Sequence, residues 1–134
     1  MRQINYNPDQ SAKAEAREMA SYIIGLLKGS GSIESDGSGM FTMTEKLRQF
    51  FCWGAKAFYF IVATDGSVGV QFKVSGLKHR GRVRIWYNAV TDYFDVEFLR
   101  ALKDVVVKEY EDIDFEQLHN VCHKFIERED DVEV

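Results

Sequence analysis

The stretch that decides the fold is residues 68–99, VGVQFKVSGLKHRGRVRIWYNAVTDYFDVEFL. Apolar residues alternate there with polar or small residues in three successive runs, which are separated by the glycine-bounded loop 76–81 and by a turn near residues 90–92. Alternation with a period of two is typical of a strand that has one face against a core. Residues 68–99 therefore predict three neighbouring antiparallel strands joined by short connections.

The turn between the last two of these strands also predicts their pairing. If the turn is centred on residues 90–91, the numbers of facing residues sum to 181. Ile85 then faces Val96 on the apolar side, and Arg84 faces Glu97 on the polar side. Both pairs suit the face on which they lie, so we expect this register.

One further strand is predicted on each side of this stretch. Residues 57–64, AFYFIVAT, precede the turn signal Asp65-Gly66. Residues 99–113 are ambiguous, because their apolar residues also fit one face of a helix. Residues 105–107 are three consecutive valines, and this β-branched run favours a strand near residues 104–111.

Helices are predicted at both ends of the chain. Apolar residues recur at steps of three and four from Ala12 to Leu27, with Asn7 as the cap, Pro8 in the first turn and Gly29 as the stop. A short helix before the first strand presents Leu47, Phe50 and Phe51 and stops at Gly54. The last helix is capped by Asp112 or Asp114, and its predicted buried face consists of Phe115, Leu118, Val121, Cys122, Phe125 and Ile126.

Together these elements predict an α+β fold, an antiparallel β-meander of four or five strands with the N- and C-terminal helices packed on one face. The length of 134 residues predicts a single domain, residues 1–134, with a flexible Gly/Ser loop at 29–39 and an acidic, frayed tail at 127–134. No secretory signal or bilayer-spanning stretch is expected, so the predicted location is cytoplasmic, without a membrane partner.

Charge is divided unevenly along the chain. Residues 46–84 contain eight basic side chains and one acidic side chain, a net charge of +7. Residues 85–134 contain five basic and fourteen acidic side chains, a net charge of −9, while the whole chain carries −4. A concentrated basic segment can bind an anion such as nucleic acid, or it can pair with the acids of its own chain.

Part of this basic segment is predicted to lie on the outward face of the sheet, where arginine and lysine can bind phosphate and an aromatic ring can stack on a base. The residues predicted to contact nucleic acid or another anion are Lys73, Lys78, His79, Arg80, Arg82, Arg84 and Trp86. The competing interpretation is a solvated face whose charges pair with acids of the next strand. In the 181 register, Lys78, Arg80 and Arg82 lie beyond the reach of those acids, so we expect them to be exposed and nearly free of intramolecular partners.

The strand at 57–64 does not alternate, because it is apolar on both sides. Such a strand is normally buried on both sides, so part of the second face of the sheet should be covered. The candidate covers are the short helix at 47–51, the Gly/Ser loop and a second copy of the protein. The residues predicted to form a partner interface are Phe58, Tyr59, Phe60 and Ile61.

Catalytic and metal chemistry find little support in the sequence. His119 and His123 are four residues apart, which suits a metal pair, but a third and fourth ligand are missing. Cys122, between them, points into the apolar face of its helix. No catalytic residue, metal site or cofactor is predicted.

We therefore expect a small non-catalytic module that binds a protein partner or a second copy of itself as a homodimer. One alternative is an accessory protein that binds nucleic acid through the basic hairpin at 73–84. A second alternative is an enzyme whose site cannot be read from the sequence. The pathway and the identity of the partner are beyond the sequence.

Overall fold

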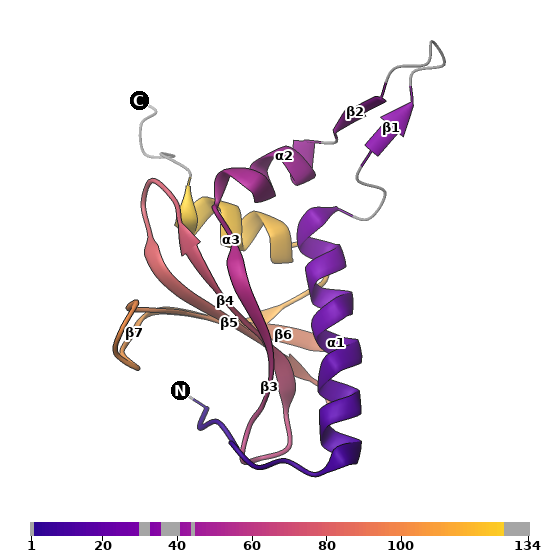
Figure 1. Ribbon diagram of the computed structural model, residues 1–134, viewed down its shortest axis with the longest axis vertical. Coiled ribbons are helices and arrows are strands. Elements are labelled where there is room, and N and C mark those ends of the chain that lie inside the picture. The colour runs from indigo at the N-terminus through magenta and orange to yellow at the C-terminus, as the bar shows by residue number, and fades with distance from the viewer. Residues whose placement is uncertain (1, 30–32, 36–40, 44, 128–134) are drawn as a thin grey trace.

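The computed structural model describes residues 2–29, 33–35, 41–43 and 45–127. Its centre is a five-stranded antiparallel sheet in the order β3-β4-β5-β6-β7, so that neighbours in the chain are neighbours in the sheet. The five strands are β3 (Lys56–Val62), β4 (Val68–Ser75), β5 (Arg80–Asn88), β6 (Tyr93–Leu99) and β7 (Val106–Ile113). The helices are α1 (Gln10–Lys28), α2 (Glu45–Cys52) and α3 (Leu118–Ile126). The predicted α+β meander with terminal helices is confirmed (Figure 1).

A two-stranded hairpin, β1 (Ile33–Ser35) and β2 (Phe41–Met43), lies between α1 and α2. The strands pair antiparallel, with Glu34 opposite Thr42. Because β1 pairs with β2, the prediction of a plain flexible loop at 29–39 was wrong for residues 33–35. Residues 30–32 and 36–39 of that loop, and the acidic tail from residue 128 onward, lie outside the described residues.

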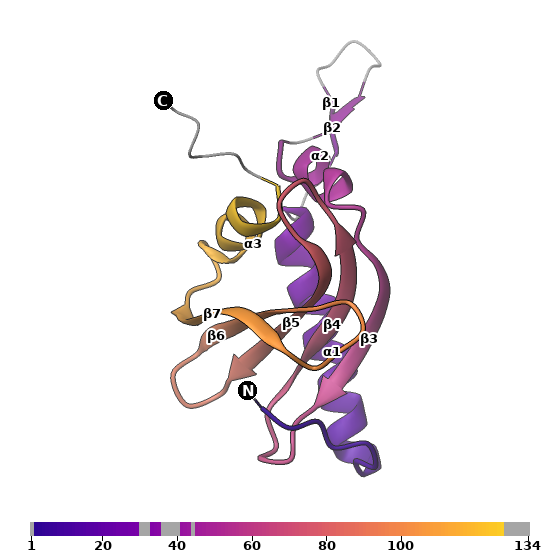
Figure 2. The ribbon, with the colours of Figure 1, turned by 90° about the vertical axis from the view of Figure 1, so that its left-hand side faces the viewer.

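The predicted register between β5 and β6 is confirmed. Ile85 faces Val96 and Arg84 faces Glu97. The ambiguous segment 99–113 contains a strand and not a helix, since its residues 106–113 form β7, which pairs antiparallel with β6. Irregularities at both ends of that pairing bend β7, and Figure 2 shows it crossing in front of the sheet on the side away from α1.

The main core lies between the sheet and all three helices. It contains apolar residues from β4, β5 and β6 together with side chains of α1, α2 and α3. Its largest fully buried members include Trp53, Phe72 and Phe98. Burial of this much apolar surface is the main stabilising contribution to the fold.

The helix boundaries differ slightly from the prediction. Asp9 caps α1, because its Oδ1 accepts the Ala12 N–H at 2.8 Å, and Gly29 ends the helix with a φ of 85°. Asp114 accepts the backbone N–H of Gln117 at 2.9 Å in a turn that precedes α3. Because Phe115 lies in this turn and not in the helix, it is exposed, and its predicted place on the buried face was wrong.

Among the described residues, the N-terminal segment covers part of the second face, whereas the short helix α2 packs on the opposite face, with the main core. Most of the Gly/Ser loop lies outside the described residues, and a cover by a second copy stays a prediction. The N-terminal residues 3–5 pair with the end of β3, where Asn5 N–H donates to Val62 O at 2.8 Å and Thr64 N–H donates to Gln3 O at 2.9 Å. Ile4 packs on a small second cluster of Ile61, Ala63 and Trp86. The periodicity of the sequence did not predict this pairing, because only three residues of the N-terminal segment take part in it. None of the described helices is long and apolar enough to cross a membrane.

Candidate functional site

A groove of about 420 Å³ crosses the second face of the sheet. The N-terminal segment forms one side of it, strands β3 to β5 form the floor, and the loop before β7 closes one end. Its lining residues are Ile4, Asn5, Tyr6, Pro8, Lys13, Tyr59, Phe60, Ile61, Val62, Gln71, Arg82, Arg84 and Asp104. Seven of these thirteen residues are apolar or aromatic, and the charged residues Arg82, Arg84 and Asp104 lie together where the loop closes the groove.

Two arginines of β5 meet a single carboxylate at this charged end. Arg82 Nη2 donates to Asp104 Oδ1 at 2.9 Å, and Arg84 Nη2 donates to the same oxygen at 3.2 Å. The side chains of Arg82 and Arg84 are 12% and 3% exposed, whereas that of Asp104 is 53% exposed. The cations are thus fixed inside the protein, while the anion reaches them from a solvent-exposed loop.

Further hydrogen bonds hold both guanidinium groups in place. Arg82 donates to the backbone carbonyls of Arg100 at 3.1 Å and Lys103 at 2.7 Å. Arg84 Nε donates to Gln71 Oε1 at 2.7 Å. The hydrogen bond from Arg82 and the nearby positive charges hold the pKa of Asp104 below its ordinary value, so Asp104 is ionised at neutral pH.

The described residues that line the groove carry an excess of positive charge. Lys13, Arg82 and Arg84 are cationic, and Asp104 is the single acid among these lining residues. Two positive charges are therefore left over, which makes the groove electrostatically complementary to an anion.

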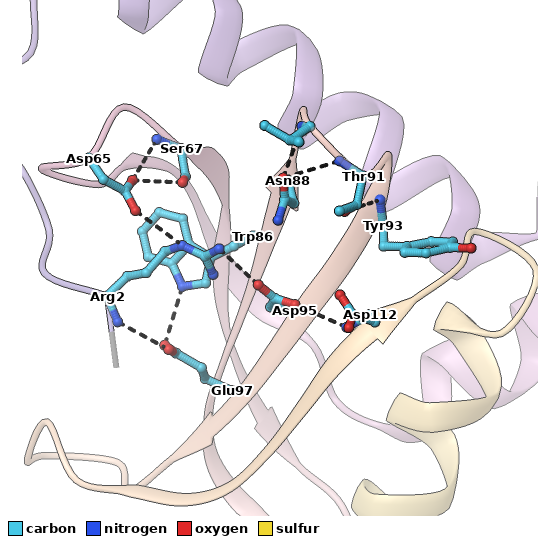
Figure 3. Close-up of polar contacts among 11 residues, drawn as sticks. Arg2, Asp65, Ser67, Trp86, Asn88, Thr91, Tyr93, Asp95, Glu97 and Asp112 are labelled. Atoms are coloured by element: carbon cyan, nitrogen blue, oxygen red, sulfur yellow. Dashed lines mark hydrogen bonds and ion pairs between the residues drawn. The ribbon is translucent and has the colours of Figure 1, made fainter.

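A cluster of polar residues beside the groove holds the N-terminal segment (Figure 3). The Arg2 guanidinium lies over the Trp86 ring, 5.7 Å from its centroid, and Arg2 Nη2 is 2.8 Å from Asp95 Oδ2. Glu97 accepts the Trp86 indole N–H at 3.2 Å and the Arg2 backbone N–H at 3.3 Å. These contacts place Arg2 beside two acids of its own chain, Asp95 and Glu97.

The edge of the sheet next to the groove is open along β3 before Val62. Only the end of β3 is paired by residues 3–5, and backbone groups alternate in direction along a strand. Because Val62 and Thr64 face the N-terminal segment, Phe60 presents its N–H and C=O to the same side. No hydrogen bond within the described part of the chain reaches that side of Phe60.

The structure does not bring the seven predicted anion-contacting residues onto one exposed surface. Trp86 is completely buried, Arg84 is 2% exposed, and His79 packs between Phe98 and Phe125. Arg82 is held by the loop before β7, in contrast to the expectation that it would be nearly free. The exposed members are Lys73, Lys78 and Arg80, and the nucleic-acid prediction now depends on them.

The predicted partner residues of β3 divide between the two faces. The Phe58 ring stacks on the rings of Phe72 and Phe50 on the side of the main core, with centroid distances of 5.1 Å and 6.2 Å. Tyr59 is 57% exposed on the other side, where Ile61 is buried beneath Ile4. Residues from the basic set and the apolar set, which the sequence treats as separate candidates, therefore line the same groove.

The two histidines of α3 have structural partners. His119 lies 2.7 Å from the Leu27 carbonyl oxygen and 2.7 Å from Gln49 Oε1, and His123 Nδ1 accepts the Trp53 indole N–H at 3.0 Å. Burial raises the pKa of the Cys122 thiol. Within the described ranges, no group of three or more His, Cys, Asp or Glu side chains is arranged to hold a metal ion.

Buried histidines should make the protein less stable in mild acid. Burial lowers the pKa of His79 and of His119 below the ordinary value of 6.5. The unfolded chain then binds protons near pH 6.5 that the folded chain does not, so stability present above pH 6.5 is lost as the pH falls below it. We expect a lower urea midpoint at pH 5.5 than at pH 7.5. The decrease should be smaller in His79→Phe, and an equal decrease would contradict this origin.

Two groove residues had little or no sequence signal. Asp104 belongs to an acid-rich half of the chain, and nothing distinguishes it there from thirteen other acids. Lys13 falls on the polar side of α1, where a lysine is ordinarily solvated. Both reach the groove only through the packing of their elements against the sheet.

Comparisons of the chain with protein-family models, with curated proteins and with solved structures found no match. The groove and the neighbouring open edge of β3 are therefore the features from which a function can be inferred.

Proposed function

We propose that this protein is a non-catalytic binding module that takes an extended segment of a partner protein along the open edge of β3. The observation that carries the proposal is the split character of this strand. Its end already accepts residues 3–5 as a short additional strand, while the backbone of Phe60 has no such neighbour. An exposed sheet edge is a template on which an extended peptide can pair.

Side chains beside the open edge suit such a partner. Tyr59 is 57% exposed and Phe58 is 37% exposed, both next to the backbone that would pair. Aromatic side chains, tyrosine above all, often dominate the energy of protein interfaces. The backbone of β3 is irregular at Ala57, whose φ is 58°, and Lys56 places a charge at the start of the strand. Both features limit pairing with a partner strand to the residues after Ala57.

The test is an NMR titration of the ¹⁵N-labelled protein with the neutral peptide acetyl-Thr-Val-Thr-Val-Thr-amide. The Phe60 amide should shift and exchange more slowly with solvent, because it gains a hydrogen-bond acceptor. The Tyr59→Ser variant should bind at least about tenfold more weakly, and Tyr93→Ser, which alters a tyrosine that is 42% exposed elsewhere, should bind normally.

The opposite edge of the sheet provides an internal control. β7 is also an edge strand, so the amide of Glu109, which lies opposite Glu97 away from the irregularities of that pairing, reports non-specific pairing. Equal shifts at Glu109 and Phe60, or no shift at Phe60, would contradict the proposal. A dimer in sedimentation velocity that Tyr59→Ser dissociates would identify the partner as a second copy.

A further inference from the structure

The groove contains a second feature that pairing at the β3 edge does not use. Its charged end holds two guanidinium groups that share one carboxylate oxygen, and an apolar floor leads away from them over Ile61 and Tyr59. The volume of about 420 Å³ lies in the range of small-molecule sites. An apolar cavity that ends in a few convergent polar groups is the usual form of such a site.

We infer that this groove binds a small amphiphilic organic acid, whose carboxylate pairs with Arg82 and Arg84 and whose apolar body lies over Ile61 and Tyr59. Asp104 occupies the position of that carboxylate in the structure described here. An incoming acid would displace it by taking over the hydrogen bonds from both Nη2 groups.

Charge and burial favour a carboxylate over a neutral ligand. Arg82 and Arg84 are largely withdrawn from water, and a guanidinium group in such a place binds an anion through short, charge-assisted hydrogen bonds. The lining residues retain a net positive charge even with Asp104 in place. Asp104 itself lies on a loop whose residues 100–104 are all exposed, so it can leave without disturbing the core.

The experiment compares octanoate with octanamide, two probes of the same shape that differ in charge. The full-length protein is titrated with each, and the Nε–H signals of Arg82 and Arg84 are followed by NMR. Octanoate should bind at least about tenfold more tightly than octanamide, because a hydrogen bond to a charged group is worth about 1.4 kcal/mol more, a factor of ten. The Ile61 amide should shift with both probes, because both share the apolar body.

Three variants test this inference, and one of them, Arg80→Gln, separates it from simple charge attraction. Asp104→Asn should raise the affinity for octanoate about threefold and leave that for octanamide unchanged, because the internal competitor has lost its charge. Arg82→Gln should abolish the preference for the acid. Arg80→Gln removes the same charge from an exposed site two residues away on β5, outside the groove, and should change neither affinity.

Equal binding of the acid and the amide would overturn the inference, as would weaker octanoate binding in Asp104→Asn. If Arg82→Gln unfolds, Asp104→Asn still tests the inference, because its expected effect is a higher affinity for octanoate. The peptide used for the β3 edge is neutral, so a failure there leaves the carboxylate result unaffected.

Discussion

Replacing Phe72 by alanine is expected to lower the free energy of unfolding by about 3–5 kcal/mol. Phe72 is completely buried in the middle of β4, where it faces Val83 across the strand pair and stacks on Phe58 at 5.1 Å. Truncation removes a buried ring and leaves a cavity between the sheet and the helices. Urea unfolding followed by circular dichroism measures the loss.

The neighbouring residue of the same strand is a matched control. Lys73 is exposed on the opposite face of β4, so Lys73→Ala should change the stability by less than about 0.5 kcal/mol. An unchanged midpoint in Phe72→Ala would contradict the assignment of this face of the sheet to the core.

A variant that lacks residues 2–5 is expected to lose about 3 kcal/mol of stability, although nearly all of the core remains. The deletion removes two backbone hydrogen bonds to the end of β3, the packing of Ile4 on Trp86, and the Arg2–Asp95 ion pair. Breaking a buried ion pair typically costs about 3–5 kcal/mol, and the lower value applies because the Arg2 side chain is 20% exposed.

The deletion should also be visible in fluorescence. Trp86 is completely buried beneath this segment, and one of the two tryptophans, Trp53, lies in the main core instead. Emission should therefore shift to longer wavelength in the folded variant. Adding Asp95→Asn and Glu97→Gln should restore part of the stability, since neutral side chains cost less to leave unpaired. No recovery would indicate that the ion pair contributes little.

Most of the fold could be predicted because its signals are local. Period-two alternation identified β4, β5 and β6, and the position of one turn fixed the register of β5 with β6, as Ile85 opposite Val96 shows. Even the uncertain segment 99–113 was resolved in favour of a strand by three adjacent valines. In each case the deciding residues lie within a few positions of one another.

The candidate site could be predicted only in pieces. Arg82 and Arg84 were selected for their charge, and Tyr59, Phe60 and Ile61 were selected because their strand is apolar on both sides. These two sets belong to strands separated by β4. They border one groove because the second face of the sheet is only partly covered. Alternation within a single strand does not reveal how much of a face is covered.

Local patterns in the sequence were enough to predict the five strands of the main sheet, the three helices, the register of the β5–β6 hairpin and the division of charge along the chain. Which charged side chains pair with one another depends on the tertiary structure. Arg2 meets an acid 93 positions away, and Arg82 meets Asp104 22 positions away. Such pairs form because the bend of β7 and the return of the N-terminal segment bring distant groups together in a partly water-excluded place. Periodicity reports which face of an element is buried, but it does not report which distant residue lies against that face.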